Sequence, residues 1–138
     1  MSARDLFHQA VRTALEKEGW IITDDPLEVE LEEITFRIDL GAERLIAAEK
    51  GEQKIAVEIK SFASNSAVSE FHTALGQFLN YQTMLEEIES ERELYLAVPK
   101  DAYISFFQTR FAKITVKKYQ VRIIVYNPDQ EVIIQWPT

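Results

Sequence analysis

Residues 54–62, KIAVEIKSF, decide how the rest of this sequence is interpreted. Apolar side chains recur there at every second position, which is typical of a β-strand with one face toward a core. Glu58 and Lys60 share the opposite face, where successive side chains are roughly 7 Å apart. The stretch therefore predicts a core strand that holds a carboxylate and an ammonium group side by side near its end.

The residues before this strand predict its hairpin partner. Residues 45–50 form another largely apolar run, and only a short glycine-containing turn separates the two runs. A two-residue loop fixes a register in which Ile46 faces Val57 and Glu43 faces Lys60. This register sorts apolar side chains to one face of the hairpin and charged side chains to the other.

The rest of the chain alternates between helical and strand patterns. Residues 4–17 and 68–87 have the apolar spacing of amphipathic helices, and a further helix is expected from Asp101 through Phe111. Further strands are predicted at residues 20–23, 35–40, 94–98, 121–126 and 132–136. Strands that alternate with helices after residue 54 require crossover connections, so we expect a mixed sheet with helices on both faces.

Three polar residues follow the edge of the first helical stripe. His8, Arg12 and Glu16 recur every four residues beside its apolar positions. We interpret them as a solvated helix flank, stabilised by pairing between neighbouring turns.

Length and composition limit the classes of protein. The chain has 138 residues, 46% of them hydrophobic, which predicts one globular domain spanning residues 1–138. It has no cysteine, which excludes disulfides and thiolate zinc sites. No apolar run approaches the roughly 20 residues of a membrane span, and the first residues lack a signal-peptide core. We therefore expect a cytoplasmic protein with no membrane contact.

The charge distribution bears on DNA binding. The net charge of −8 argues against tight unaided binding, because lysine and arginine must neutralise phosphates. Residues 100–122 nevertheless contain six basic residues and only one acidic residue, Asp101. Because such a local basic patch can contact a nucleic acid, DNA stays a candidate partner that binds weakly by itself.

Glu58 and Lys60 indicate phosphodiester chemistry. A Glu-x-Lys pair that ends an apolar strand, after a hairpin and before a helix, is similar to the PD-(D/E)xK nuclease signature. That resemblance implies a restriction-endonuclease-like α/β fold of three layers, a central mixed β-sheet flanked by helices. Gln77 precedes Tyr81 by four residues on the next helix, as in the resolvase-like branch of these enzymes. The candidate catalytic residues are Asp39, Glu58, Lys60 and Gln77.

A magnesium site would need oxygen ligands from two or three carboxylates. The candidate ligands are Asp39, Glu43 and Glu58, and we expect Mn²⁺ to substitute for Mg²⁺. Asp39 can join only if a bulge at Gly41 folds the strand inward, since a straight strand would hold it about 20 Å from Leu45.

Long motifs along the chain carry a second resemblance. They are ARDLFHQAV (3–11), IDLGAERLIAAEKG (38–51), KIAVEIKSF (54–62), FHTALGQFLNYQ (71–82), LYLAVP (94–99) and IIVYNPDQEVIIQW (123–136). These motifs resemble the XisH family, the fdxN element excision controlling factors known from cyanobacteria. The resemblance implies controlled site-specific excision of a DNA element, alongside a recombinase and a small partner, XisI. The usual nuclease aspartate falls at Arg44, so Asp39 or Glu43 must stand in for it.

Three functions stay open at this point. The leading one is control of programmed DNA excision, through DNA or the recombination machinery. The Glu-x-Lys pair favours a Mg²⁺-dependent DNA endonuclease or resolvase, whereas the acidic charge favours a non-catalytic protein-binding regulator. An acidic protein that acts on DNA needs a partner that supplies a basic surface or masks the acidic one, so we expect association with a XisI-like protein. Self-association into a homo-oligomer is left open.

Overall fold

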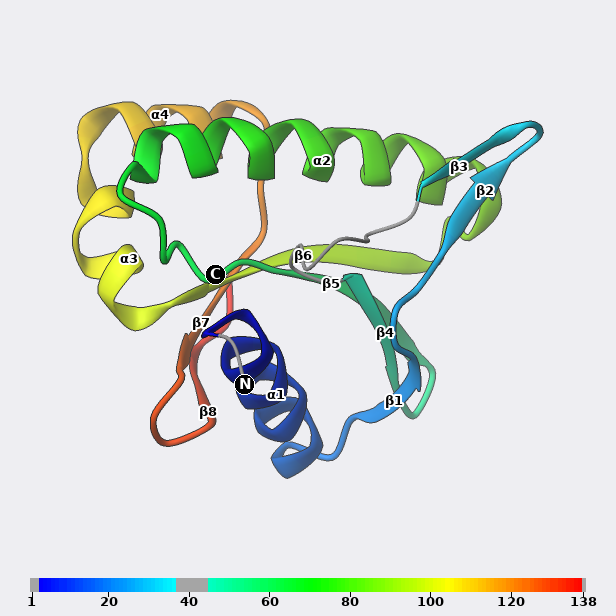
Figure 1. Ribbon diagram of the computed structural model, residues 1–138. Helices are drawn as coiled ribbons and strands as arrows, with labels where there is room; N and C mark the ends of the chain where they lie inside the picture. The colour runs from blue at the N-terminus through cyan, green and yellow to red at the C-terminus, as the bar shows by residue number, and fades with distance from the viewer. Residues whose placement is uncertain (1–2, 37–44, 138) are drawn as a thin grey trace.

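Eight strands and four α-helices make up the computed structural model, which describes residues 3–36 and 45–137 (Figure 1). The strands are β1 (Ile21–Asp24), β2 (Val29–Leu31), β3 (Ile34–Phe36), β4 (Leu45–Lys50), β5 (Gln53–Ile59), β6 (Arg92–Pro99), β7 (Ile123–Asn127) and β8 (Val132–Gln135). The helices are α1 (Ala3–Lys17), α2 (Ala67–Ile88), α3 (Lys100–Ile104), a 3₁₀ turn η1 (Phe106–Gln108) and α4 (Arg110–Lys118).

The main sheet is mixed, as predicted. Its six strands lie in the order β1-β4-β5-β6-β7-β8, and β2 pairs only with β3 in a separate ribbon. The β4–β5 hairpin has the predicted register, with Leu45 opposite Glu58 and Ile46 opposite Val57. β5, β6 and β7 run parallel, because helices cross over between them. The predicted α/β architecture is therefore confirmed.

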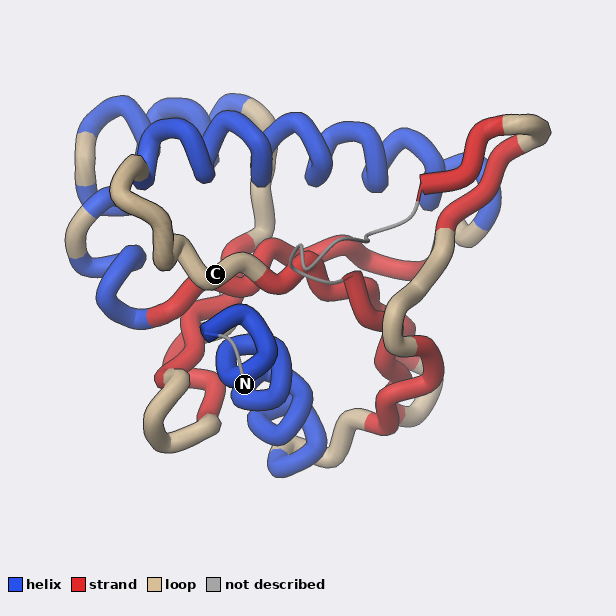
Figure 2. The backbone as a smooth tube through the Cα atoms, in the orientation of Figure 1, coloured by secondary structure: helices blue, strands red, loops and turns tan. Residues whose placement is uncertain are grey.

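Helices cover the sheet on both sides, α1 on one and α2 with α4 on the other (Figure 2). Ile55, Val57 and Ile59 pack in the apolar cluster under α1. The alternating pattern predicts a single core face, but Ala56 and Glu58 on the other face are also fully buried, because α2 covers them. The charged face of the central strand is thus an interior surface.

The prediction of one continuous helix from Asp101 through Phe111 is wrong. Two breaks divide this segment into α3, η1 and α4. The hydroxyl of Ser105 donates to the carbonyl of Asp101 at 2.6 Å, and Thr109 caps α4 by accepting from the amide of Ala112 at 3.3 Å. Such side-chain bonds to the backbone compete with a continuous helix.

The interpretation of His8 and Arg12 as solvated flank residues is also wrong. His8 Nε2 lies 2.9 Å from Asp25 Oδ1, and Arg12 Nη1 donates to Asp25 Oδ2 at 2.7 Å. These bonds join α1 to the turn that follows β1. Gly19 ends α1 as expected, since its φ of +92° suits glycine.

None of the described helices combines the length and the apolar composition that a membrane span requires.

Candidate functional site

Glu58, Lys60 and Gln77 come together beneath α2. Glu58 is completely buried and Lys60 is 5% exposed. Lys60 Nζ donates to Gln77 Oε1 at 2.6 Å and lies 3.7 Å from Glu58 Oε2. Three of the predicted site residues therefore form one cluster, two of them buried and Gln77 half-buried, which we call the charged cluster.

The backbone of Lys60 is fixed by the neighbouring parallel strands. Its amide donates to the carbonyl of Ala97 at 3.0 Å, and its carbonyl accepts from the hydroxyl of Tyr126 at 2.9 Å. Ala97 belongs to β6 and Tyr126 to β7. These bonds hold Lys60 in strand geometry just beyond the end of β5, so its side chain stays on the same face as Glu58.

Helix α2 contributes the side-chain amide of Gln77 to the charged cluster and places the phenol of Tyr81 near Glu58. Ser66 begins the helix by accepting a hydrogen bond from the amide of Ser69, and apolar side chains such as Phe71 and Phe78 bury one face of it against the sheet. Gln77 and Tyr81 are four residues apart, so they lie on the same side of the helix. Burial, and then the negative charge of Glu58, raise the pKa of Tyr81 above its ordinary value.

Tyr81 is a site neighbour that the sequence interpretation did not include among the candidate site residues. Its position four residues after Gln77 is the signal that could have placed it there. Tyr81 is a neutral hydrogen-bond donor at neutral pH, as tyrosines usually are, and its raised pKa extends that protonated state to more alkaline pH.

Packing alone gives little reason for this group of polar residues. Removing two charges from water costs several kcal/mol per ion, and apolar residues of similar volume often serve stability as well or better. Buried ionisable groups with specific partners are frequent at functional sites. The charged cluster is therefore the strongest candidate site in the described part of the chain.

Of the three carboxylates predicted to bind Mg²⁺, Glu58 is the one that lies in the described part of the chain. The other two, Asp39 and Glu43, lie outside the described residues. Within residues 3–36 and 45–137, no three acidic or histidine side chains gather as a metal site would require. The described donor set thus fits one carboxylate ligand of a Mg²⁺ ion, and the full site stays a prediction.

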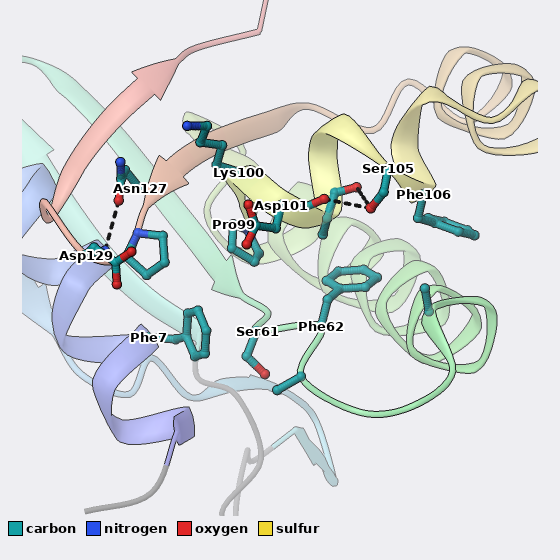
Figure 3. A pocket seen from close by; sticks show the side chains of 14 residues that line it. Phe7, Ser61, Phe62, Pro99, Lys100, Asp101, Ser105, Phe106, Asn127 and Asp129 are labelled. Atoms are coloured by element: carbon teal, nitrogen blue, oxygen red, sulfur yellow. Dashed lines mark hydrogen bonds between the residues drawn. The ribbon is translucent and has the colours of Figure 1, made fainter.

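A cavity of about 350 Å³ opens just beyond the charged cluster (Figure 3). Ser61 and Phe62, which directly follow Lys60, form part of its wall. The carboxyl ends of β5, β6 and β7 meet at this edge, where open α/β sheets commonly bind ligands. Asp101 and Asp129 add polar groups from the segments after β6 and β7. The strand order, rather than any motif, is the signal for this cavity.

Comparison with known proteins identifies the family. A family model described as XisH protein matches residues 1–134. The crystal structure of an fdxN element excision controlling factor protein from Anabaena variabilis is 51% identical, with a TM-score of 0.89 over 97% of this chain and 99% of that chain. An XisH family protein from Nostoc punctiforme PCC 73102 is 50% identical, with a TM-score of 0.88 over 97% of this chain and 100% of that one. No curated protein matches the chain. The resemblance carried by the sequence motifs is confirmed, and the chain belongs to the XisH family.

Proposed function

We propose that this protein controls the programmed, site-specific excision of a DNA element, together with a site-specific recombinase and a XisI-like partner. One observation carries the proposal. The Anabaena variabilis protein, an fdxN element excision controlling factor, shares 51% of its residues and nearly its whole length with this chain. Two chains this similar in sequence and in fold are expected to act in the same process, here in the cytoplasm.

The scaffold on which it acts is nuclease-like. Apart from the separate β2–β3 ribbon between β1 and β4, the elements α1, β1, the β4–β5 hairpin, α2 and β6 follow one another in the helix–strand–hairpin–helix–strand order expected of a restriction-endonuclease-like core. Glu58 and Lys60 occupy the end of the central strand in that order. We expect excision control to use the charged cluster, because packing does not explain why its charges are buried.

A basic partner would offset the acidic charge of this protein. The net charge of −8 opposes association with DNA, whereas the basic residues of α4 are all exposed. Lys113 and Lys117 also line a groove of about 590 Å³ between α4 and β8. These side chains suffice for a local contact with phosphates, and the XisI-like partner would supply the remaining basic surface.

A second candidate function is a Mg²⁺-dependent DNA endonuclease or resolvase. The contact of Lys60 with Gln77 beside Glu58 favours it. Glu58, with Asp39 and Glu43, would hold a Mg²⁺ ion that supplies an activated water and stabilises phosphate charge. Lys60 would add a fixed positive charge beside the phosphate.

Reconstitution tests the leading function. A plasmid carrying the element would be incubated with the recombinase, the XisI-like partner and this protein, and the excised junction would be quantified by PCR. We expect the junction only when all three proteins are present. The same yield of junction without this protein would contradict the proposal.

A metal titration separates the two candidates. Calorimetry with Mn²⁺ would compare the wild type with Glu58→Ala, beside a cleavage assay on branched DNA. Heat and cleavage that both disappear in Glu58→Ala would favour the endonuclease. Negligible heat and no cleavage in either protein would leave excision control without nuclease chemistry. Lys54→Gln is the matched control, because Lys54 lies on the same strand and its ammonium pairs with the exposed Glu91 at 3.7 Å.

A further inference from the structure

A smaller cavity, of about 250 Å³, lies at the other end of the central strands from the charged cluster. Its wall includes Ile55 near the start of β5 and Tyr95 of β6, whereas Lys60 lies beyond the far end of β5. Its main lining residues are Glu18, Trp20, Lys50, Glu93, Tyr95 and Trp136. We call it the aromatic pocket, and neither the motifs nor the proposed function assigns it a role.

Three aromatic rings form walls that meet at different angles. The rings of Trp20 and Trp136 have centroids 5.9 Å apart with an interplanar angle of 33°. Tyr95 meets Trp136 edge to face, with centroids 5.6 Å apart. Trp136 Nε1 donates to Glu18 Oε1 at 2.9 Å, which fixes the orientation of that indole. The rings are therefore held in place before any ligand arrives.

The protein already places a cation of its own in this pocket. Lys50 Nζ lies 5.9 Å from the ring centroid of Trp20, within the range of a cation–π contact. Its side chain passes over Gly19, where an added Cβ would lie 3.5 Å from Lys50 Cε. Lys50 is itself exposed, so this cation can leave the ring for water at low cost.

The charge around the rings suits a cation. Glu18 and Glu93 bring two carboxylates to the wall, which Lys50 and the nearby Arg122 balance, so a cation that displaces Lys50 restores the charge balance of the pocket. Glu93 also pairs with Arg122 at 3.5 Å, on the side of the strand that is open to solvent.

We propose that the aromatic pocket binds the ammonium or guanidinium end of a lysine or arginine side chain from a protein partner, which displaces Lys50. Aromatic walls with carboxylates at the rim are the usual means of recognising such a cation. The volume equals roughly eight waters, enough for the end of one such side chain. The protein's net charge of −8 also favours a basic partner. The proposal does not depend on the excision function.

Tryptophan fluorescence gives a specific test, because the chain has two tryptophans and both line this pocket. The full-length protein would be titrated with N-acetyl-arginine amide, N-acetyl-lysine amide and tetramethylammonium, with neutral tert-butanol as the uncharged control. We expect a saturable change with the cations and none with tert-butanol.

Variants then locate the response. Lys50→Gln removes the internal competitor, so the apparent Kd for each cation should fall by about threefold or more. Tyr95→Leu keeps both tryptophans but removes one wall, and it should weaken binding about fivefold. The matched control is Lys118→Gln, since Lys118 lies 5.5 Å from the ring of Tyr119 on α4, and this variant should bind as the wild type does.

Three results would overturn the proposal. The first is the absence of a saturable response to any cation in both the wild type and Lys50→Gln. The second is an equal response to tert-butanol, which would make the pocket merely apolar. The third is a response to tetramethylammonium without one to the arginine and lysine models, which would assign the pocket to a free small cation. If Tyr95→Leu does not fold, exposed Glu93→Gln takes its place and should also weaken binding.

Discussion

The two faces of β5 are equally buried but chemically opposite. Toward α1, Ile55, Val57 and Ile59 fill an apolar cluster. Toward α2, Ala56 is followed by Glu58 and then Lys60, all shielded from solvent. The first face is explained by removing apolar surface from water, whereas the second holds charges whose burial costs free energy. We propose that the α1 face serves the fold alone, whereas the buried charges of the α2 face serve the function.

The largest expected effect comes from breaking the buried charge pair. Lys60→Met leaves Glu58 buried without the ammonium 3.7 Å away, so the free energy of unfolding should fall by about 3–5 kcal/mol. On the α1 face, Ile59→Val should cost only about 0.5–1.5 kcal/mol. Urea unfolding at neutral pH measures both. Equal losses for the two variants would remove the contrast between the faces.

The second-largest loss of stability is expected when the side-chain amide of Gln77 is removed. Gln77→Leu removes the acceptor that Lys60 Nζ binds at 2.6 Å, and a lost bond to a charged group costs about 1.5–3 kcal/mol. Gln82→Leu is the control on the same helix, because the side-chain amide of Gln82 donates to the exposed Glu86 at 3.2 Å rather than to a buried charge. A Gln77 variant that unfolds at the same urea concentration as the Gln82 variant would contradict the geometry of the charged cluster.

Tyr81 gives the α2 face a pH signature. Its pKa is raised above 10.0 in the folded protein, so the native state keeps a proton that the unfolded chain releases. The resulting stabilisation is complete below about pH 10 and is lost as the pH rises toward the folded pKa, at about 1.4 kcal/mol per pH unit. Tyr81→Phe should therefore lose stability less steeply above pH 10. Tyr95, whose pKa is also raised, keeps part of the slope in both proteins. Unfolding free energies that fall in parallel would refute this assignment.

How much the sequence predicts differs between these regions for physical reasons. The register of Ile46 with Val57 follows from side-chain alternation and a short loop, both of which are local. The burial of Glu58 depends on α2 crossing back over the sheet, which no pattern within β5 encodes. The expectation that Gln77 lies near Lys60 came from a known signature, and the contact at 2.6 Å agrees with it.

Two other differences have similar causes. The helix after Pro99 is broken because the hydroxyl groups of Ser105 and Thr109 donate hydrogen bonds to backbone carbonyls. The spacing of apolar residues, from which the helix is predicted, contains no information about such bonds. His8 and Arg12 meet Asp25 only once the chain has turned after β1, so their spacing on α1 gave no sign of it.

The smallest change in stability is expected when both charges are replaced together. Glu58→Leu with Lys60→Met leaves no unpaired charge inside, so stability should stay within about 1 kcal/mol of the wild type or rise. Thermal unfolding compares this double variant with Lys60→Met alone. A double variant as unstable as the single one would mean that the pair itself stabilises the fold.

The excision assay on that double variant tests the central claim, that the buried pair of Glu58 and Lys60 serves function and not stability. The variant would replace the wild type beside the recombinase and the XisI-like partner, with Ile59→Val as the matched substitution on the α1 face. The account predicts a folded double variant whose excised junction drops at least about tenfold, which corresponds to 1.4 kcal/mol, while Ile59→Val excises normally. A stable double variant that excises as well as the wild type would contradict it.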